Sequence, residues 1–188
     1  MGSKNLAIVR QSFANTTFTH KVQEVAAEFQ EEKARMVRIG NILVVAIVLF
    51  ILILQATNSS NPIFSYIGAG VTAGEIIFLI IQLTFSYEQR VLSHKNSALK
   101  YLGLRDNYRA LITDIMNSSL IPDAVTTRRD LLQREYQIIS DLSPQTGQAE
   151  YREAQKRLNK QGIVEGEDFT WSDAEIDRFL PEELRLKS

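Results

Sequence analysis

One long stretch of the chain carries almost no charge. Between Arg38 and Glu88, Glu75 is the single residue of the Asp, Glu, Lys and Arg classes. Charged side chains are the ones that most often remain in water on a folded surface, so a globular domain rarely goes this far without one. We therefore expect most of this stretch to face something other than water.

Two apolar runs fill the stretch. The first extends from Met36 to Ala56 around the unbroken segment ILVVAIVLFILIL, and the second extends from Ile63 to Tyr87. A transmembrane helix needs about 20 consecutive apolar residues to cross the hydrocarbon core of a bilayer. Both runs are long enough, and we expect membrane-spanning helices at about residues 39–56 and 63–86.

The linker between the runs, TNSSNP, is polar, uncharged and too short for more than a tight turn. Backbone amides in lipid must be satisfied within each helix, so we expect a helical hairpin. Two alternatives compete with this interpretation. A signal peptide is disfavoured because the first run starts late, after a charged segment, and lacks a small-residue cleavage pattern. A buried hairpin in a soluble protein is disfavoured because no other part of the chain could cover two such helices.

The basic residues around the spans predict their orientation, since Lys and Arg collect in the cytoplasmic loops of membrane proteins. The turn between the spans contains neither residue type. Six basic residues flank the hairpin, and they are Lys33, Arg35, Arg38, Arg90, Lys95 and Lys100. We expect both termini to lie in the cytoplasm and the turn to lie outside.

Glu75 lies near the middle of the second span, where an ionisable side chain costs about 2.5–3.5 kcal/mol on insertion scales. Such residues normally face the interior of a helix bundle or water. Steps of three and four residues from Glu75 predict one helix face that is small or polar except at Leu79. This stripe consists of Ser65, Gly68, Thr72, Glu75, Leu79, Gln82 and Ser86. The first span has no such stripe, so we expect it to face lipid and the second span to be the inner helix.

Gly70 and Gly74 add a small-xxx-small spacing, which lets two membrane helices approach closely. Two roles for the stripe remain open. In one, Glu75, Thr72 and Gln82 line a pore or its gate; in the other, they form hydrogen bonds between helices and Glu75 is protonated. Both roles need further helices, because two spans cannot enclose a channel alone. We therefore expect a homo-oligomer.

Helices are also expected on both sides of the hairpin, since no strand-like alternation is present. The helix before the first span has an apolar face made of Val22, Val25, Ala26 and Phe29. We expect this face to pack against later helices rather than to bind a membrane surface. The helix after the second span has an apolar face made of Tyr101, Leu104, Tyr108, Leu111, Ile112 and Ile115.

Two more helices are expected before the C-terminal segment. Pro122 opens the first, and its inward residues are predicted to be Leu131, Leu132, Tyr136, Ile139 and Leu142. The loop SPQTG ends this helix. A short helix then carries the apolar residues Tyr151, Ala154 and Leu158.

Residues 162–188 form an acidic extension with 8 acidic and 3 basic side chains, a net charge of about −5. Ser172 and Glu175 fit a capping box that opens a last helix, Asp173 to Leu180, ended by Pro181. The extension is too short to fold alone. Two interpretations stay open, a latch that docks on basic residues of the chain's own helices and a solvated, disordered tail. Its apolar residues include Phe169, Trp171, Ile176 and Phe179.

We therefore predict an all-α membrane protein with four parts. These are a cytoplasmic amphipathic helix at 1–38, a transmembrane hairpin at 39–87, a cytoplasmic helical domain at 88–161, and the acidic extension at 162–188.

Few residues offer catalytic or ligand-binding chemistry. The chain has no cysteine, which excludes disulfides and thiolate metal sites. His20 and His94 are far apart and are expected on a surface or helix face. Arg128 and Arg129 could bind a phosphate, but a solvated helix face is the favoured interpretation. The net charge of −1 gives no indication of a nucleic-acid partner, and we expect no enzyme activity, no cofactor and no metal.

Several segments resemble the SLATT domain, a family of two-transmembrane effector domains. The resemblance covers about residues 15–160 and includes HKNSALKYLGLRDNYRALITDI after the second span and SPQTGQAEYREAQKRL after the next helix. Residues 162–188 lie beyond it. The residues that carry it are His94, Ala98, Tyr108, Arg109, Ala110, Leu111, Pro144, Tyr151 and Ala154.

The resemblance implies an effector of the bacterial inner membrane that forms pores or disrupts the bilayer. Such domains accompany nucleotide-second-messenger and nucleotide-sensing proteins in prokaryotic conflict systems. The implied role is antiviral defence, in which the effector acts downstream of a sensor and causes growth arrest or death. The expected partners are the lipid bilayer, further copies of the chain and a cytosolic sensor or nucleotide-signalling protein. The alternative is a non-conducting anchor that holds a cytosolic partner at the membrane, but an anchor has no need for the polar stripe.

Overall fold

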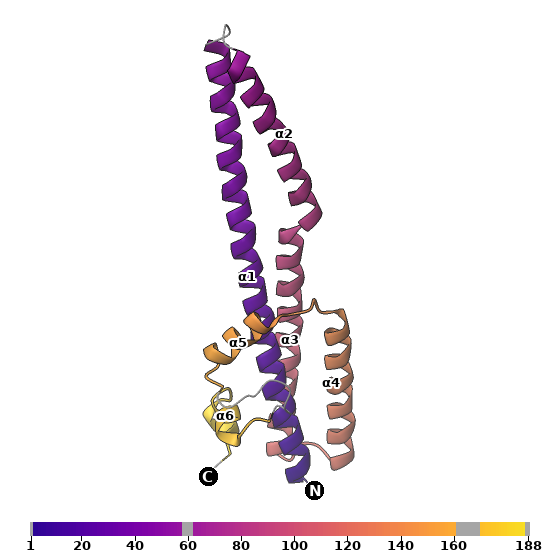
Figure 1. Cartoon of the computed structure of the whole chain (residues 1–188). Coiled ribbons are helices and arrows are strands. Elements are labelled where there is room, and N and C mark those ends of the chain that lie inside the picture. Colours follow the sequence, from indigo (N-terminus) through magenta and orange to yellow (C-terminus); the bar gives the residue numbers. More distant parts are fainter. Residues whose placement is uncertain (1, 58–61, 161–169, 187–188) are drawn as a thin grey trace. The chain divides into compact units, whose positions relative to one another are not determined.

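The computed structural model describes residues 2–57, 62–160 and 170–186, except for the side chains of residues 2–3 and 82–85. Every regular element in these ranges is helical and none is a strand, so the predicted all-α class is confirmed (Figure 1). The turn expected between the two spans lies largely outside the described residues. In chain order the elements are α1 (Gly2–Thr57), α2 (Pro62–Phe85), α3 (Tyr87–Met116), α4 (Pro122–Leu142), α5 (Gln148–Arg157), α6 (Asp173–Asp177) and the 3-10 helix η1 (Glu182–Leu184).

The chain folds into two compact units. The helical unit comprises Met1–Ala27 and Leu92–Ser188, and the hairpin unit comprises Glu28–Val91. The long helix α1 contributes its first half to the helical unit and its second half to the hairpin unit. The N-terminal residues therefore pack with helices that follow the hairpin in sequence.

The core of the helical unit forms mainly between α1 and α3. Val22, Val25 and Ala26 of α1 are buried, as their spacing predicts. The predicted apolar face of α3 is also buried, apart from the half-buried Ile115. Each fully buried side chain of this size contributes about 1.5–3 kcal/mol through removal from water. The buried members of the α3 face are Tyr101, Leu104, Tyr108, Leu111 and Ile112.

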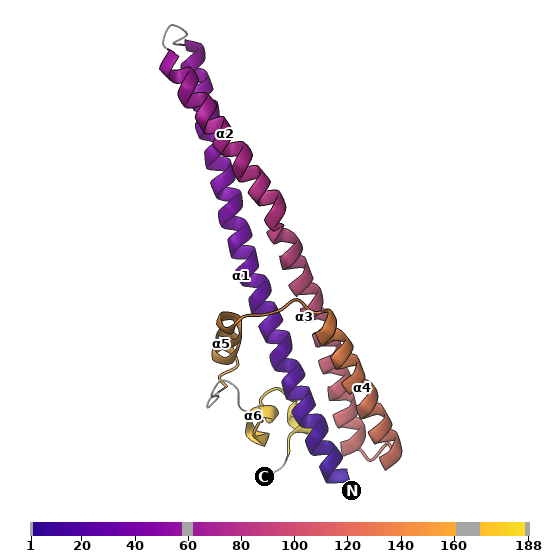
Figure 2. The same cartoon turned by 45° about the vertical axis from the view of Figure 1, so that its right-hand side comes forward.

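Helix α4 runs back beside α3 (Figure 2). Pro122 opens it, as predicted, because proline suits the first helical turn, where its missing N–H costs no helical hydrogen bond. Leu132 and Ile139 are buried, but Leu131 and Leu142 are exposed, so their predicted inward position is wrong. Successive residues on a helix are about 100° apart, and Leu131 therefore cannot share the direction of Leu132.

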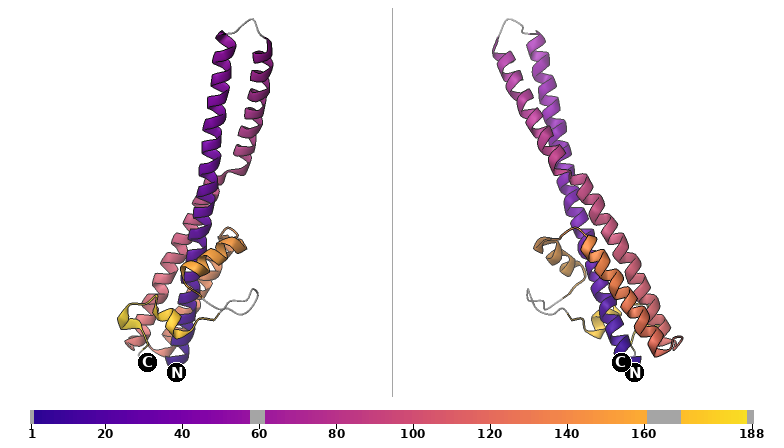
Figure 3. Two further views of the ribbon diagram at one scale, coloured as in Figure 1. Left: turned by 60° about the vertical axis from the view of Figure 1, so that its left-hand side comes forward. Right: turned by 90° about the vertical axis from the view of Figure 1, so that its right-hand side faces the viewer.

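The described part of the acidic extension packs on α1 rather than standing free in water (Figure 3). Trp171, Ile176 and Leu180 are all buried. The predicted capping box is present: the Ser172 N–H donates to the Glu175 carboxylate (2.9 Å), and the Glu175 N–H donates to the Ser172 hydroxyl (3.4 Å). The helix it opens ends at Asp177, three residues before the predicted end. Phe169 lies outside the described residues.

In the hairpin unit, α2 returns alongside the second half of α1 (Figure 1). On both helices the less exposed residues recur every three or four positions, which is the spacing of a coiled-coil seam. We call this contact line the seam. On α1 it consists of Ala34, Val37, Asn41, Val44, Val48 and Ile51, and on α2 of Phe64, Gly68, Val71, Glu75 and Phe78.

Both helices of the hairpin are long and apolar enough to cross a membrane. Almost none of their apolar segments is buried inside the protein, because each helix covers only one side of the other. Large aliphatic and aromatic side chains such as Ile42, Leu49, Phe50, Ile76 and Ile80 are consequently exposed. Lipid is the environment in which such surfaces are stable.

Candidate functional site

The polar residues predicted to form one stripe lie on α2 of the hairpin unit, except Ser86, which lies between α2 and α3. One edge of the stripe, with Gly68 and Glu75, lies on the seam with α1, and the other edge, with Ser65 and Thr72, is exposed. Ser86 is exposed as well. The side chain of Gln82 lies outside the described residues, so its place on the stripe stays a prediction.

At Gly68 α2 lies close to α1, and Gly68 is the one buried residue in the described part of α2. A Cβ atom at this position would lie 3.4 Å from Ile51 Cγ2 and 3.6 Å from Gln55 Oε1. One turn earlier, Gln55 Nε2 donates to the hydroxyl of Ser65 at 3.4 Å. These contacts fix the register of the two helices near the turn.

Glu75 follows Gly68 by seven residues and occupies the equivalent position on the seam, where it is half-buried. A carboxylate in an apolar setting needs hydrogen-bonding or charged partners to offset its loss of hydration. On α1, the same seam holds Asn41, whose side-chain oxygen is buried without a hydrogen-bond partner among the described residues. The seam therefore contains a buried polar atom whose hydrogen-bonding capacity the described residues do not use.

A flank of α2 beside the seam carries Gly70 and Gly74. Both are exposed, and a Cβ atom at either would meet no described atom within 4 Å. Glycine in a helix interior costs about 1 kcal/mol relative to alanine. The pair is thus unused for packing within this chain and leaves α2 open to close approach by another helix.

The helix breaks at Ser86, between α2 and α3. The helix expected after the second span is thus not continuous with α2, and Ser86 between them has a φ of +26°. Positive φ is unfavourable for residues other than glycine, so the surrounding structure must hold this backbone in place. The Ser86 carbonyl accepts hydrogen bonds from the N–H groups of Gln89 (3.0 Å) and Arg90 (3.3 Å), which starts α3 afresh.

A cavity of about 620 Å³ lies at this break. Its walls come from Ala34, Val37 and Arg38 on α1 and from residues around the break between α2 and α3. Across its mouth, Arg38 Nη2 lies 2.6 Å from the Glu88 carboxylate. Both side chains are exposed, and such a pair contributes at most about 1 kcal/mol. The pair joins α1 to the start of α3 beside the break, but it is too weak to hold the break in one conformation.

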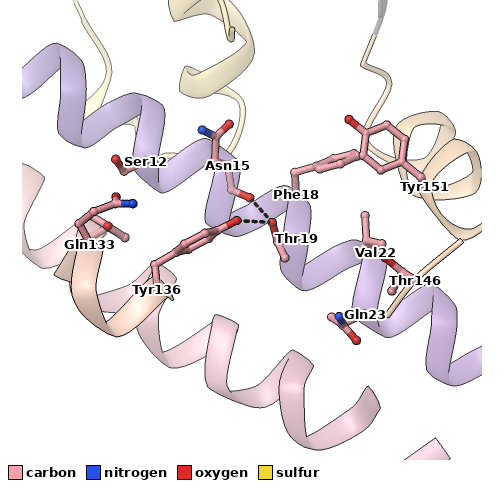
Figure 4. Close-up of a pocket in the computed structure, with 11 residues that line it drawn as sticks. Ser12, Asn15, Phe18, Thr19, Val22, Gln23, Gln133, Tyr136, Thr146 and Tyr151 are labelled. Carbon is pink, nitrogen blue, oxygen red and sulfur yellow. Dashed lines mark hydrogen bonds between the residues drawn. The ribbon is translucent and has the colours of Figure 1, made fainter. Parts of the chain in front are cut away.

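The helical unit contains a second cavity, of about 400 Å³, between α1, α3, α4 and α5 (Figure 4). None of its described lining residues is charged. Thr19 donates to the carbonyl of Asn15 (2.9 Å) and lies 3.2 Å from the Tyr136 hydroxyl. Phe18 and Tyr151 meet edge to face with ring centres 4.8 Å apart. Sequence reasoning missed this cavity because its residues come from four segments and share no local pattern.

Tyr108 lies on the wall of the second cavity and is fully buried. Burial raises its pKa to about 12, although the nearby hydroxyl of Ser12 acts in the opposite direction. Its own hydroxyl has no hydrogen-bond partner at standard geometry among the described residues. The cavity thus offers one buried donor, but its open, uncharged walls identify no ligand.

The two histidines are buried and hydrogen-bonded, so the predicted surface position is wrong, whereas a helix-face position holds. His20 Nδ1 lies 2.8 Å from the carbonyl of Ala98, and His94 Nδ1 lies 2.7 Å from the side-chain oxygen of Gln23. His20 thus connects α1 to α3 directly, whereas His94 contacts Gln23 of α1, whose side-chain amide also donates to the carbonyl of Pro144 in the loop before α5 at 3.2 Å.

Arg128 and Arg129 are paired within the helical unit. Arg128 Nη1 lies 2.7 Å from Asp114, and Arg129 Nη2 lies 2.7 Å from Asp130. These carboxylates would compete with a phosphate. Within the described ranges, no group of three or more His, Cys, Asp or Glu side chains is arranged to hold a metal ion.

These features define an all-α protein built around a two-helix hairpin suited to a membrane, with one polar residue of each helix on its seam. The family model of the SMODS and SLOG-associating 2TM effector domain family 4, a SLATT family, matches residues 6–175. The match covers nearly the whole chain, and the chain belongs to this family. It is thus a membrane protein and an effector domain of a class linked to defence systems. No curated protein and no solved structure matches the chain.

Proposed function

We propose that the protein is an oligomeric membrane effector of prokaryotic antiviral defence that opens an ion-conducting pore. Downstream of a sensor, it would depolarise the inner membrane and cause growth arrest or death. The observation that carries the proposal is Glu75, a half-buried carboxylate on the seam of a hairpin that is otherwise free of charge between Arg38 and Glu88. A residue this costly in lipid is normally functional.

In the structure Glu75 lies toward α1 and not on the outer side of α2. We assign this arrangement to the resting state. Activation would turn α2 about its axis, so that Glu75 and its stripe leave the seam and face water at the centre of the oligomer. The break at Ser86 supports this step, because it uncouples α2 from α3 and lets α2 turn without carrying α3 with it.

The helix surfaces that the hairpin leaves uncovered favour oligomerisation. Two helices cannot enclose a pore, and each covers only one side of the other. The open Gly70 and Gly74 flank accommodates α2 of another copy at short range, where van der Waals contact rather than the hydrophobic effect drives association. A protonated Glu75 that only bonds between helices would also need such a partner.

For the topology, we propose that both termini lie in the cytoplasm and the turn lies outside. Six basic residues flank the hairpin and none lies in the turn, which is the arrangement of cytoplasmic flanks. Reporter fusions at residue 1 and after residue 188 should both read cytoplasmic. A reporter inserted at residue 60 should read external, and disagreement at any of the three overturns the topology.

The second candidate function is a non-conducting anchor that recruits a cytosolic partner through the helical unit. The cavity of about 400 Å³ in that unit is the observation in its favour. An anchor does not require a carboxylate on the seam, however, and any apolar residue at position 75 would serve it better.

Membrane potential separates the two functions. The chain would be expressed with its genomic neighbours in cells stained with a potential-sensitive dye and then challenged with phage. A pore predicts depolarisation that Glu75→Leu abolishes at equal protein level, whereas the matched seam variant Phe78→Leu retains it. An anchor predicts no depolarisation by the wild-type chain under any trigger.

A further inference from the structure

An apolar groove runs along the outer side of the helical unit between α3 and α4. Its volume is about 480 Å³. Leu99 and Gly103 of α3 lie on one side, and Ile138 and Leu142 of α4 lie on the other. Its lining also includes the charged residues Lys100 and Glu135. The groove is separate from the cavity between α1, α3, α4 and α5, and none of its lining residues belongs to the hairpin unit.

Its apolar side chains are exposed to an unusual degree. The exposed fractions are 63% for Leu99, 60% for Ile138 and 70% for Leu142. Leu131, at 53%, extends the α4 side. Burying one such side chain fully is worth about 1.5–3 kcal/mol, and contiguous exposed patches of this kind mark interaction sites. The sequence pattern assigns Leu131 and Leu142 to a buried face, but no described residue of the chain buries them.

Helix α4 is consequently apolar on two sides. Leu132 and Ile139 point into the unit, while Leu131, Ile138 and Leu142 form a second stripe at spacings of seven and four residues. Glu135 lies on this second stripe. A helix that rests on an anionic membrane carries Lys and Arg around its apolar residues, so a carboxylate at the centre of the stripe argues against a lipid surface.

The charges at the groove identify the occupant as a second copy of the chain. Lys100 lines the α3 side of the groove and Glu135 lines the α4 side. A twofold axis brings the same patch of two subunits together and exchanges its sides. Lys100 of each copy then faces Glu135 of the other, twice per interface. Gly103 leaves room between them, because a Cβ atom there would meet no described atom within 4 Å.

We propose that the α3–α4 groove is the interface through which the helical unit pairs, by twofold symmetry, with the same unit of a second copy. This inference deepens the proposed oligomer and rests on it. It adds a contact surface outside the spans, by which paired helical units bring two hairpins together before the spans associate.

The experiment uses full-length protein in isolated membranes and exploits the absence of cysteine from the chain. Single-cysteine variants Ile138→Cys and Gln137→Cys are treated with a short bis-maleimide. Both positions are exposed and adjacent on α4, but only Ile138 lies on the groove. The proposal expects several-fold more cross-linked dimer from Ile138→Cys. Equal yields from the two, or no dimer from Ile138→Cys, would overturn it.

Charge reversal tests the twofold pairing. In the Ile138→Cys background, Lys100→Glu or Glu135→Lys alone places like charges together and should lower the dimer yield. The double variant Lys100→Glu with Glu135→Lys restores opposite charges and should restore the yield. Yields that do not change with the reversals, or a double variant no better than the singles, contradict the proposal. Trp171 fluorescence verifies that each variant is folded.

A third cysteine separates this inference from the proposed function. Gly70→Cys reports association of the spans. Cross-linking at Gly70→Cys without cross-linking at Ile138→Cys rejects the groove and leaves the membrane oligomer standing. If neither position cross-links, the oligomer and the groove both fail. An environment-sensitive dye can be attached at Ile138→Cys and, for comparison, at Gln137→Cys. A dye that reports lipid at the first position and water at the second identifies a bilayer as the occupant of the groove. That result also rejects the second copy.

Discussion

The guanidinium Nη2 of Arg10 lies 2.6 Å from the Oδ1 atom of Asp177, and the pair joins α1 to the C-terminal segment across 167 residues of sequence. Arg10 is almost completely buried, and a second nitrogen of its guanidinium donates to the carbonyl of Leu184 at 3.3 Å. A buried arginine must be paired, since an uncompensated buried charge is strongly destabilising. The acidic extension therefore completes the core of the helical unit.

Asp177→Ala should destabilise the helical unit by about 2–3 kcal/mol, because it removes the main partner of a buried charge. Asp173→Ala is the matched control, since Asp173 is 67% exposed and its carboxylate lies 3.4 Å from Arg10. The control should cost under about 1 kcal/mol. Thermal unfolding of the full-length protein in detergent measures both, and equal losses would mean that Arg10 does not depend on Asp177.

Acid should loosen the C-terminal segment through Glu175. Burial raises the pKa of this carboxyl, but hydrogen bonds from Lys160 and Ser172 lower it by more, so the pKa lies below its usual value of 4.5. A carboxyl with a depressed pKa contributes stability that is complete above its unfolded value and is lost as the pH falls through the folded value. The contribution should therefore disappear as the pH is lowered from 4.5.

Trp171 reports this loss directly, since it is the only tryptophan in the chain and lies 4.4 Å from the ammonium group of Lys160. Its emission should shift to longer wavelength as the pH falls. Glu175→Gln cannot ionise and should lack this part of the acid dependence. A variant with an unchanged acid profile would show that other groups hold the segment.

Truncation after residue 161 tests whether the segment is a latch on activity as well as part of the fold. The deletion removes Asp177, which pairs with Arg10. It also removes Trp171, whose indole N–H donates to the side-chain oxygen of Asn15 at 2.8 Å. We expect lower thermal stability together with higher toxicity or altered assembly. A truncated protein that is less stable but has unchanged toxicity and assembly would limit the segment to a structural role.

Gly70→Ile combined with Gly74→Ile should shift the detergent-solubilised protein to smaller species. A Cβ atom at either position would meet no described atom within 4 Å, so the substitution is expected to act on contacts with other copies. Gly40→Ile is the control, because Gly40 lies in α1 and is also open. Size-exclusion chromatography measures the distribution, and an identical shift in the control would argue against a contact centred on α2.

Periodicity predicts much of the helical unit, because a helix must bury an apolar face and the predicted faces of α1 and α3 are largely buried there. It failed for α4, where apolar residues occupy two sides and only the packing distinguishes them. The sequence does not predict the break at Ser86, because no glycine or proline lies there. The sequence does not predict the buried position of Arg10 either, because its partner is remote in sequence and a lone arginine normally indicates a solvated surface.

The polar stripe illustrates the same limit within the hairpin. The described members of the stripe on α2 have the spacing of one helix face, but the sequence does not reveal which edge of that face meets α1. Register decides this, and register depends on close contacts such as Gly68 against Ile51. The seam position of Glu75 could therefore come only from the structure.

Potassium efflux from liposomes that contain the purified full-length protein tests the central claim most directly. Raising the protein-to-lipid ratio favours oligomers by mass action and so replaces the natural trigger. We predict efflux that rises steeply with this ratio, is absent for Glu75→Leu and persists for Phe78→Leu. No efflux by the wild-type protein at any ratio, or equal efflux by Glu75→Leu, would contradict a pore that depends on Glu75.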